Sequence, residues 1–416
     1  MITPSFSLTA TERVLPSMAL DFTTASLDSR VTFTRSGNTA TVTNSSGVIA
    51  AINANLPRFD FDPIALTCKG LLIEEARTNF TLGSVAFNNV TYWTPSSATI
   101  GATPITAPDN TSTGFKLVES ATTAVHLISA VLSWATTIGQ IITRSVYVKA
   151  GERFRFEIQA DSAAYGAVQR AGFNLQTVTA SITTGTGTAR IVNVGNGWYR
   201  CSFTAPAATA ISASTGGQFR ILDDAGNPSY AGNGTSGLYL WGAQREDGAF
   251  ATSFIPTVAS TVLRNVDVAT MTSTNFSSWY TATIGAAVVW AIPQAVTGVR
   301  PLLQFDDTTA LEIITLRGNV ADPELYIVDG GVAQAQIDAG TIVANTAYKL
   351  SGGWDTNNCA AAKDGGTVGT DVVATIPTPT QLRIGSDGTN YASAIIQKVL
   401  YYPQRIINAE VQAISK

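Results

Sequence analysis

Charged residues are scarce in this chain, and their scarcity excludes several classes of protein. Only 13% of the 416 residues are charged, whereas 45% are hydrophobic. Disordered chains show the opposite balance, so the sequence predicts a folded protein, with two or three domains at this length. The net charge of −4 is small and there is no basic stripe, so nucleic acid is not an expected partner. No apolar run reaches the roughly 18–20 residues that span a bilayer, so membrane insertion is not expected.

Residues that commonly carry catalysis are also rare. His126 is the single histidine, and it lies in a strand-like run where a structural role is expected. Cys68, Cys201 and Cys359 are far apart, which fits neither a disulfide framework nor a zinc site. Without a second histidine, a Ser-His-Asp or Cys-His arrangement has no support. The nucleophile elbow and the phosphate-binding glycine loop are missing as well.

Glycan cleavage needs two carboxylates about 5–10 Å apart on either side of the scissile bond. Asp60-Phe-Asp62 is the one clean pair at i and i+2, and it precedes the predicted sandwiches. The sequence therefore predicts that the protein is not an enzyme. Loops that begin at Asp223, Asp355 and Ser386 offer oxygen ligands for Ca²⁺, but the same residue types form ordinary turns. No metal or other cofactor is predicted.

The dominant pattern is alternation of polar and apolar residues, which is typical of half-buried strands. It is clearest over 144–149 and 153–158, and the Ala-Gly-Glu turn between these runs predicts a β-hairpin. Turn signals recur about every ten residues, which favours β-sandwiches of the jelly-roll kind. A short helix is predicted at the C-terminus, with Asn408 as its cap and Glu410 in its first turn.

The sequence divides into three parts: an extended N-terminal arm (1–79), a first β-sandwich (80–257) and a second one (258–416). The arm holds many of the few charged residues. Their clustering predicts ion pairs that lock the arm onto a domain or into a subunit interface, rather than independent solvated charges. The residues concerned are Arg35, Arg58, Asp60, Asp62, Glu74, Glu75 and Arg77.

Six segments resemble structural proteins of bacteriophage particles. They are Leu20-Asp-Phe-Thr-Thr24, Leu27–Gly37, Leu56-Pro-Arg-Phe-Asp-Phe-Asp62, Cys68–Asn79, Leu240–Pro256 and Ile395–Glu410. The last segment is similar to the final strand and helix of a concanavalin-like (laminin-G-like) jelly roll, which is the fold implied for 258–416. A jelly roll like those of carbohydrate-binding modules is implied for 80–257. The resemblance covers tail-fibre-like and head-fibre or decoration proteins and does not separate head from tail.

The resemblance implies a virion structural protein, assembled in the host cytoplasm, that acts as a fibre or spike component. Such a protein is expected to form a homo-oligomer, most simply a trimer, and to contact other virion proteins through its N-terminal arm. Repeated copies would attach the particle to host polysaccharide by avidity. The alternative is a purely architectural decoration or cement protein without a ligand, and a glycan depolymerase is less favoured.

Sugar binding commonly uses an exposed aromatic ring beside a few polar groups. Four aromatic residues lie in loop-like sequence and are candidate ligand contacts, with packing inside the fold as the alternative: Trp93, Trp134, Trp279 and Tyr391. The remaining tryptophans fall within strand-like runs and are expected in the core: Trp198, Trp241, Trp290 and Trp354.

Overall fold

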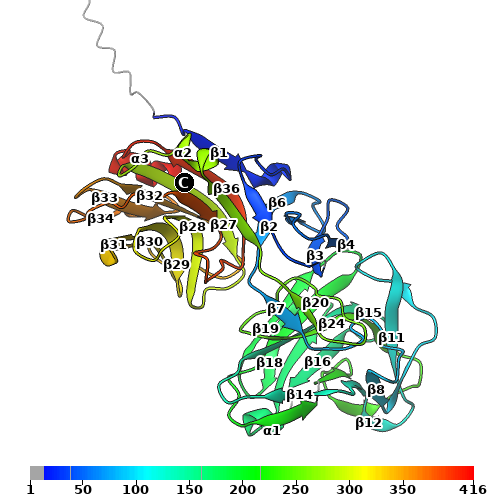
Figure 1. The fold of residues 1–416 in the computed structure, drawn as a ribbon. Coiled ribbons are helices and arrows are strands. Elements are labelled where there is room, and N and C mark those ends of the chain that lie inside the picture. The colour runs from blue at the N-terminus through cyan, green and yellow to red at the C-terminus, as the bar shows by residue number, and fades with distance from the viewer. Residues whose placement is uncertain (1–13, 38, 161, 216) are drawn as a thin grey trace, which may run out of the picture.

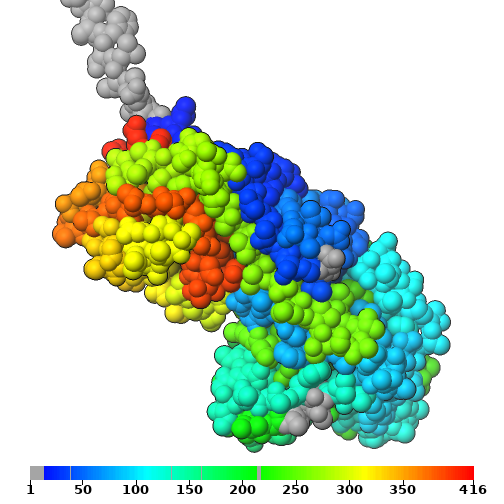
Figure 2. Space-filling view, in the orientation of Figure 1, coloured from blue at the N-terminus to red at the C-terminus, as the bar shows by residue number. Residues whose placement is uncertain are grey.

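The computed structural model describes residues 14–37, 39–160, 162–215 and 217–416. These residues form two lobes, each a β-sandwich, arranged in an elongated molecule (Figures 1 and 2). The predicted all-β class is confirmed, because the described helices are short and nearly all regular structure is strand.

One lobe, which we call the base lobe, packs an eight-stranded sheet against a seven-stranded sheet. The first sheet contains β1 (Met18–Asp21), β5 (Phe59–Phe61), β6 (Cys68–Ile73), β27 (Gly285–Pro293), β32 (Tyr348–Trp354), β33 (Cys359–Lys363), β34 (Gly369–Asp371) and β36 (Ala394–Tyr402). The second contains β2 (Thr32–Thr34), β26 (Val268–Thr272), β28 (Val299–Asp306), β29 (Ile313–Asn319), β30 (Asp322–Asp329), β31 (Val332–Asp338) and β35 (Gln381–Ile384). Phe305, Trp354 and Tyr401 lie at the centre of the apolar layer between the sheets.

The other lobe spans residues 80–257 and also has two sheets. One contains β9 (Ala98–Ile100), β10 (Ile105–Thr106), β11 (Ser112–Glu119), β15 (Ile142–Ala150), β19 (Thr188–Asn193), β20 (Trp198–Thr204) and β24 (Gly237–Asp247). The other contains β8 (Trp93–Ser96), β13 (Leu127–Ala130), β16 (Arg155–Ala160), β17 (Gln169–Asn174), β18 (Thr179–Thr184) and β22 (Gln218–Ile221). On β15 the alternation places Val146 and Val148 in the core and Tyr147 on the opposite face.

The remaining elements are strand pairs and short helices. The strand pairs are β3 (Ala40–Thr43) with β4 (Ile49–Ile52), β7 (Arg77–Asn79) with β25 (Val262–Arg264), β12 (Thr123–Val125) with β23 (Ser229–Ala231), and β14 (Ser133–Thr136) with β21 (Ser212–Thr215). The helices are η1 (Phe22–Thr24), α1 (Ser162–Tyr165), α2 (Thr274–Ser277) and α3 (Asn408–Ile414). None of the described helices has the length and apolar character needed to cross a bilayer.

The segment 1–79 is not a separate arm in its described part. Strands β1 and β6 both pair with β36, and β2 pairs with β26, so this segment completes both sheets of the base lobe. The lobe 80–257 is therefore inserted into the base lobe's sequence, and we call it the inserted lobe. The chain leaves the base lobe through β7 and returns through β25, and these two crossings pair with each other.

Two local predictions were wrong. Strands β15 and β16 do not form a hairpin, because β15 pairs with β20 and β24 whereas β16 pairs with β17 and β22 in the opposite sheet. The C-terminal helix is present, but Ile407 is its N-cap and Asn408 is its first residue. Glu410 does lie in the first turn, as predicted.

Candidate functional site

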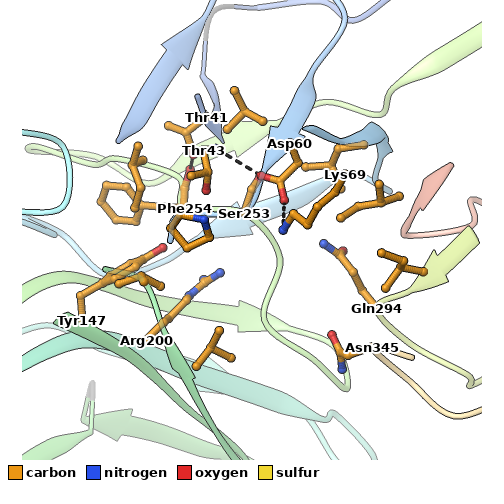
Figure 3. A pocket seen from close by; sticks show the side chains of 18 of the residues that line it. Thr41, Thr43, Asp60, Lys69, Tyr147, Arg200, Ser253, Phe254, Gln294 and Asn345 are labelled. Carbon is orange, nitrogen blue, oxygen red and sulfur yellow. Dashed lines mark hydrogen bonds and ion pairs between the residues drawn. The ribbon is translucent and has the colours of Figure 1, made fainter. Parts of the chain in front are cut away.

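A cleft between the two lobes is the main candidate site (Figure 3). It has two connected compartments of about 300 and 560 Å³. Four polar residues line both compartments: Arg190, Arg200, Gln294 and Asn345. Arg190 and Arg200 come from β19 and β20 of the inserted lobe, while Gln294 and Asn345 come from loops of the base lobe. The site therefore exists only when both lobes are present.

Some polar groups in the cleft have no hydrogen-bond partner within the described part of the protein. The Arg200 guanidinium lies 5.4 Å from the centre of the Tyr147 ring, and its Nη2 donates to Ser145 Oγ at 3.1 Å. In the described part of the chain, neither Arg200 nor Arg190 forms an ion pair with a carboxylate. The buried Arg200 Nε and Gln294 Oε1 have no hydrogen-bond partner there either. A ligand rich in hydroxyl and carboxylate oxygens would satisfy these groups.

Asp60 is the one carboxylate among the described residues that line the cleft. Lys69 forms an ion pair with it, and the backbone amide of Thr43 donates to its Oδ1 at 3.2 Å (Figure 3). The pair of carboxylates that glycoside hydrolysis uses is therefore not found on these walls. Among the described residues, no three His, Cys, Asp or Glu side chains gather in a way that could hold a metal ion.

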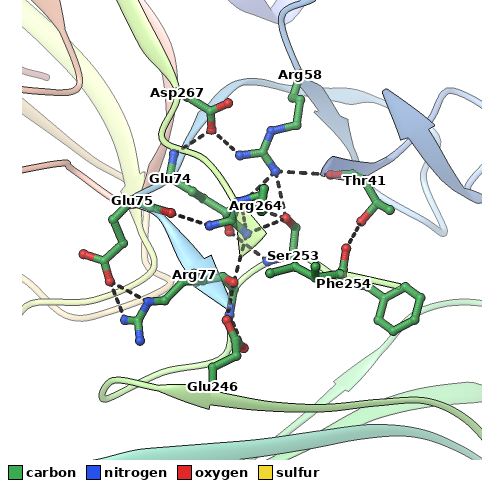
Figure 4. A network of polar contacts seen from close by, with 12 residues as sticks. Thr41, Arg58, Glu74, Glu75, Arg77, Glu246, Ser253, Phe254, Arg264 and Asp267 are labelled. Atoms are coloured by element: carbon green, nitrogen blue, oxygen red, sulfur yellow. Dashed lines mark hydrogen bonds and ion pairs between the residues drawn. The ribbon is translucent and has the colours of Figure 1, made fainter. Parts of the chain in front are cut away.

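Behind Ser253, which lines the cleft, a buried ion-pair cluster lies near the crossing between the lobes (Figure 4). We call Arg35, Arg58, Glu74, Arg264 and Asp267 the junction cluster. Glu74 Oε2 accepts from Arg58 at 2.7 Å and lies 3.0 Å from Arg264, and Asp267 bonds to Arg35 at 3.0 Å and also to Arg58. All five side chains are fully buried. Because each charge has an opposite partner, the cluster can exist without water.

The junction cluster also joins the two crossings, because Arg264 on β25 pairs with Glu74, which lies just before β7. Ser253 donates to Glu74 through its backbone amide at 2.8 Å and through its hydroxyl at 2.7 Å. Burial alone would raise the pKa of Glu74. The charges of Arg264 and Arg58, together with the hydrogen bonds from Ser253, outweigh burial and hold this pKa well below its usual range. Glu74 is therefore ionised in the folded protein at every physiological pH.

Acid should weaken this junction in a way that depends on Glu74. A carboxylate whose pKa is lowered by folding stabilises the protein above its ordinary pKa of 4.5, and this stabilisation is lost as pH falls toward the folded-state value. We expect the Glu74 contribution to fall by about 1.4 kcal/mol for each pH unit between 4.5 and the lower folded-state pKa. Urea unfolding of wild type and Glu74→Gln at pH 6 and pH 3 measures it. A stability difference between the two proteins that is the same at both pH values would contradict the prediction.

The predicted ion-pair residues of segment 1–79 are only partly brought together. Arg35, Arg58 and Glu74 enter the junction cluster, but their partners Arg264 and Asp267 lie far away in sequence and were not predicted. Glu75 pairs with Arg77 and, at 2.7 Å, with Arg300. Asp60 pairs with Lys69. Asp62 accepts from the backbone amides of Ile64 and Ala65 and so forms a turn.

The four candidate sugar-contacting aromatics do not line the cleft. Trp93 and Trp279 are core residues, 1% and 6% exposed, and each indole N–H donates to a backbone carbonyl, so both pack inside the fold. Trp93 lies on β8 rather than in a loop, whereas Trp279 does lie in a turn. Trp134 on β14 and Tyr391 are half-buried. Of the predicted core tryptophans, Trp198, Trp241 and Trp354 are buried. Trp290 is half-buried, between the ammonium groups of Lys349 and Lys398.

The remaining single-residue predictions concern His126 and the loops that offered oxygen ligands. His126 is fully buried and hydrogen-bonds to the carbonyls of Ser97 and Tyr230, as a structural histidine would. Asp223 and Asp387 each accept from the backbone amides of their own loops. Both carboxylates thus form the turns that their sequences also allowed.

No protein-family model matches this sequence, and no curated protein matches it either. Several solved structures show limited similarity. The CBM40 of the Ruminococcus gnavus IT-sialidase, bound to α2,3-sialyllactose, has a TM-score of 0.30 and 12% identity, covering 34% of this chain and 88% of its own. Domain 4 of the Geobacillus stearothermophilus arabinanase AbnA, in complex with arabinotriose, has a TM-score of 0.30 and 12% identity, covering 40% and 81%.

The mouse laminin α1 chain domains LG4-5 match a larger share of this chain. Their TM-score is 0.23 with 8% identity, covering 70% of this chain and 88% of the laminin fragment. These identities and TM-scores are too low to carry any ligand over to this chain. Its function has to be inferred from its own residues.

Proposed function

We propose that this chain is a non-catalytic structural component of a bacteriophage particle that attaches the particle to polysaccharide on the host surface. The interlobe cleft, with Arg200 as its central contact, is the proposed binding site. The phage assignment is supported by the resemblance of the sequence segments quoted above. The attachment role is supported by a cleft whose polar groups are left unsatisfied in the described part of the fold.

Acidic sugars fit the chemistry of the cleft better than neutral ones. Arg190 and Arg200 bring two positive charges to one wall, and the carboxylate that faces them, Asp60, is already paired with Lys69. A guanidinium binds a sugar carboxylate through charge-assisted hydrogen bonds, while the Gln294 and Asn345 amides can bond to hydroxyl groups. Weak binding at one cleft becomes useful when a homo-oligomer, which we propose to be a trimer, presents several copies.

The direct test is binding of the full chain to a panel of acidic and neutral bacterial capsular polysaccharides. Arg200→Ala should weaken binding about tenfold to a hundredfold, since a hydrogen bond to a charged group contributes about 1.5–3 kcal/mol. Arg30→Ala is the matched control, because Asp28, in a surface turn of the base lobe, is its one ion-pair partner among the described residues. Equal binding by wild type and Arg200→Ala would exclude the cleft as the site.

A second candidate function is a purely architectural protein, and one surface feature favours it. Four exposed apolar residues lie at one edge of the base lobe, around the β30–β31 turn and the loop after β34 (Gly369–Asp371): Leu311, Val332, Val372 and Val373. This edge could contact neighbouring subunits or other virion proteins. A folded oligomer that binds no polysaccharide, and that dissociates when Val373 is changed to Lys, would favour this function over attachment.

A further inference from the structure

Two arginines lie opposite each other inside the inserted lobe. Arg144 on β15 and Arg245 on β24 are cross-strand partners, and both are only 2% exposed. Arg144 shares the inward face of β15 with Val146 and Val148, which belong to the core. The two guanidinium groups are thus placed between the sheets rather than in solvent.

Neither guanidinium forms an ion pair with a carboxylate in the described part of the chain. The Nε and both Nη atoms of Arg144, and the Nε and Nη2 atoms of Arg245, are buried without a hydrogen-bond partner there. Burial and the charge of Arg144 lower the pKa of Arg245 to about 10, although the charge of Asp247 acts in the opposite direction. The Asp247 Oδ1 atom and the Tyr165 hydroxyl are themselves buried and unpartnered.

The junction cluster shows how the same chain normally buries arginine. Arg58 and Arg264 are as deeply buried as Arg144, yet each bonds to a carboxylate within 3.0 Å. A buried charge without a partner is strongly destabilising, whereas a paired one is tolerated. The contrast indicates that Arg144 and Arg245 are completed by an anion that the described residues do not supply.

A small cavity provides the place for that anion. It measures about 10 Å³ and is lined by Arg245 together with Thr81, Tyr92, Leu132 and Trp134, which is room for about one water-sized atom. On another side the Arg245 guanidinium lies 5.2 Å from the centre of the Phe80 ring. Leu132 is 41% exposed and Trp134 is half-buried, so the cavity lies close to the surface of the lobe.

We infer that Arg245, with the charge of Arg144 beside it, binds the carboxylate or phosphate group of an anion. One oxygen of that group occupies the cavity beside Arg245, and the rest of the molecule extends past Leu132 and Trp134. The anion is either a free small ion or the carboxylate of an acidic sugar, since the two share this chemistry. The site belongs to the inserted lobe alone and does not depend on the interlobe cleft.

Thermal unfolding of the full chain tests the site at constant ionic strength. Sodium chloride is the reference, and it is replaced in part by acetate, phosphate or glucuronate, with glucose as the uncharged comparison. A ligand that binds only the folded state raises Tm as its concentration rises, and we expect a shift of about 3 °C or more at 50 mM. A response to all three anions identifies a free ion as sufficient, whereas a response to glucuronate alone identifies an acidic sugar.

Variants of Arg245 and of a control residue show whether the anion-dependent shift in Tm comes from the proposed site. Arg245→Met keeps most of the side-chain volume and should abolish the anion-dependent shift, while Arg30→Met should retain it. If Arg245→Met does not fold, arsenate, an analogue of phosphate, soaked into crystals of the wild type should give an anomalous peak beside Arg245. Asp161, outside the described residues, follows β16 in sequence, and Asp161→Asn should respond as wild type does. No shift with any anion, a shift retained by Arg245→Met, or a shift seen only in Asp161→Asn would each overturn the proposal.

Discussion

Replacing Glu74 with glutamine should lower the free energy of unfolding by about 3–5 kcal/mol, the cost of breaking a buried ion pair by removing one partner. Glu74 is the shared acceptor of Arg58 and Arg264, and all three side chains are fully buried. Without its charge, Arg264 has no carboxylate partner among the described residues and Arg58 keeps only Asp267. Denaturant unfolding of the full chain measures the loss.

The control for this variant is Glu152→Gln. Glu152 pairs with a single basic residue among the described residues, Lys116, and its side chain is 58% exposed. Such a surface pair contributes about 0–1 kcal/mol, so the control should unfold almost as wild type does. A loss below 1 kcal/mol for Glu74→Gln would show that the junction cluster does not hold the lobes together.

Replacing Phe254 with alanine should both destabilise the protein and loosen the arrangement of the lobes. Phe254 lies near the end of the inserted lobe, just before the returning crossing, and is 4% exposed. Its ring centre lies 4.7 Å from that of Trp241 and 6.1 Å from that of Tyr147. Truncating a buried Phe costs about 3–5 kcal/mol. The same change removes the apolar contact that fixes the crossing on β15 and β24, so small-angle scattering should give a larger radius of gyration.

Val258→Ala is the matched control for Phe254→Ala. Val258 lies in the same stretch of chain, between the inserted lobe and β25, but is 74% exposed, so its truncation should change stability by no more than about 0.5 kcal/mol. An unchanged radius of gyration for Phe254→Ala would mean that the lobes are held by the ion pairs alone.

The sequence predicted the class of fold but not its connectivity. Alternation identified the strand at 144–149 because a period of two reports which face of a strand is buried. It says nothing of which strand lies alongside, so β15 and β16 were assigned to one hairpin when they belong to opposite sheets. The insertion escaped prediction for the same reason, since it rests on pairing of β6 with β36 across most of the chain.

Sequence analysis predicted only those site residues that lie close together in the sequence. Charged residues cluster in segment 1–79 although the chain has few of them, and this clustering predicted that Arg35, Arg58 and Glu74 form ion pairs. A second small group, Arg264-Asn-Val-Asp267, was visible in the sequence and could have been proposed as the partner. Nothing local distinguishes Arg200 from other strand arginines, because the cleft arises from the packing of one lobe against the other.

The insertion also determines which fragment can be studied. A fragment of residues 258–416 would lack β1, β2, β5 and β6, which complete both sheets of the base lobe. Its failure to bind a polysaccharide would therefore say nothing about the intact protein. Binding experiments need the full chain.

Two paired crossings, rather than one tether, connect the inserted lobe to the rest of the molecule. If a cell surface pulls on the inserted lobe, the load divides between β7 and β25 and passes into strands of both base-lobe sheets. A protease that cuts one crossing leaves the lobe held by the other crossing and by the buried charges between them. The inserted lobe therefore stays connected to the base lobe after a single break in either crossing.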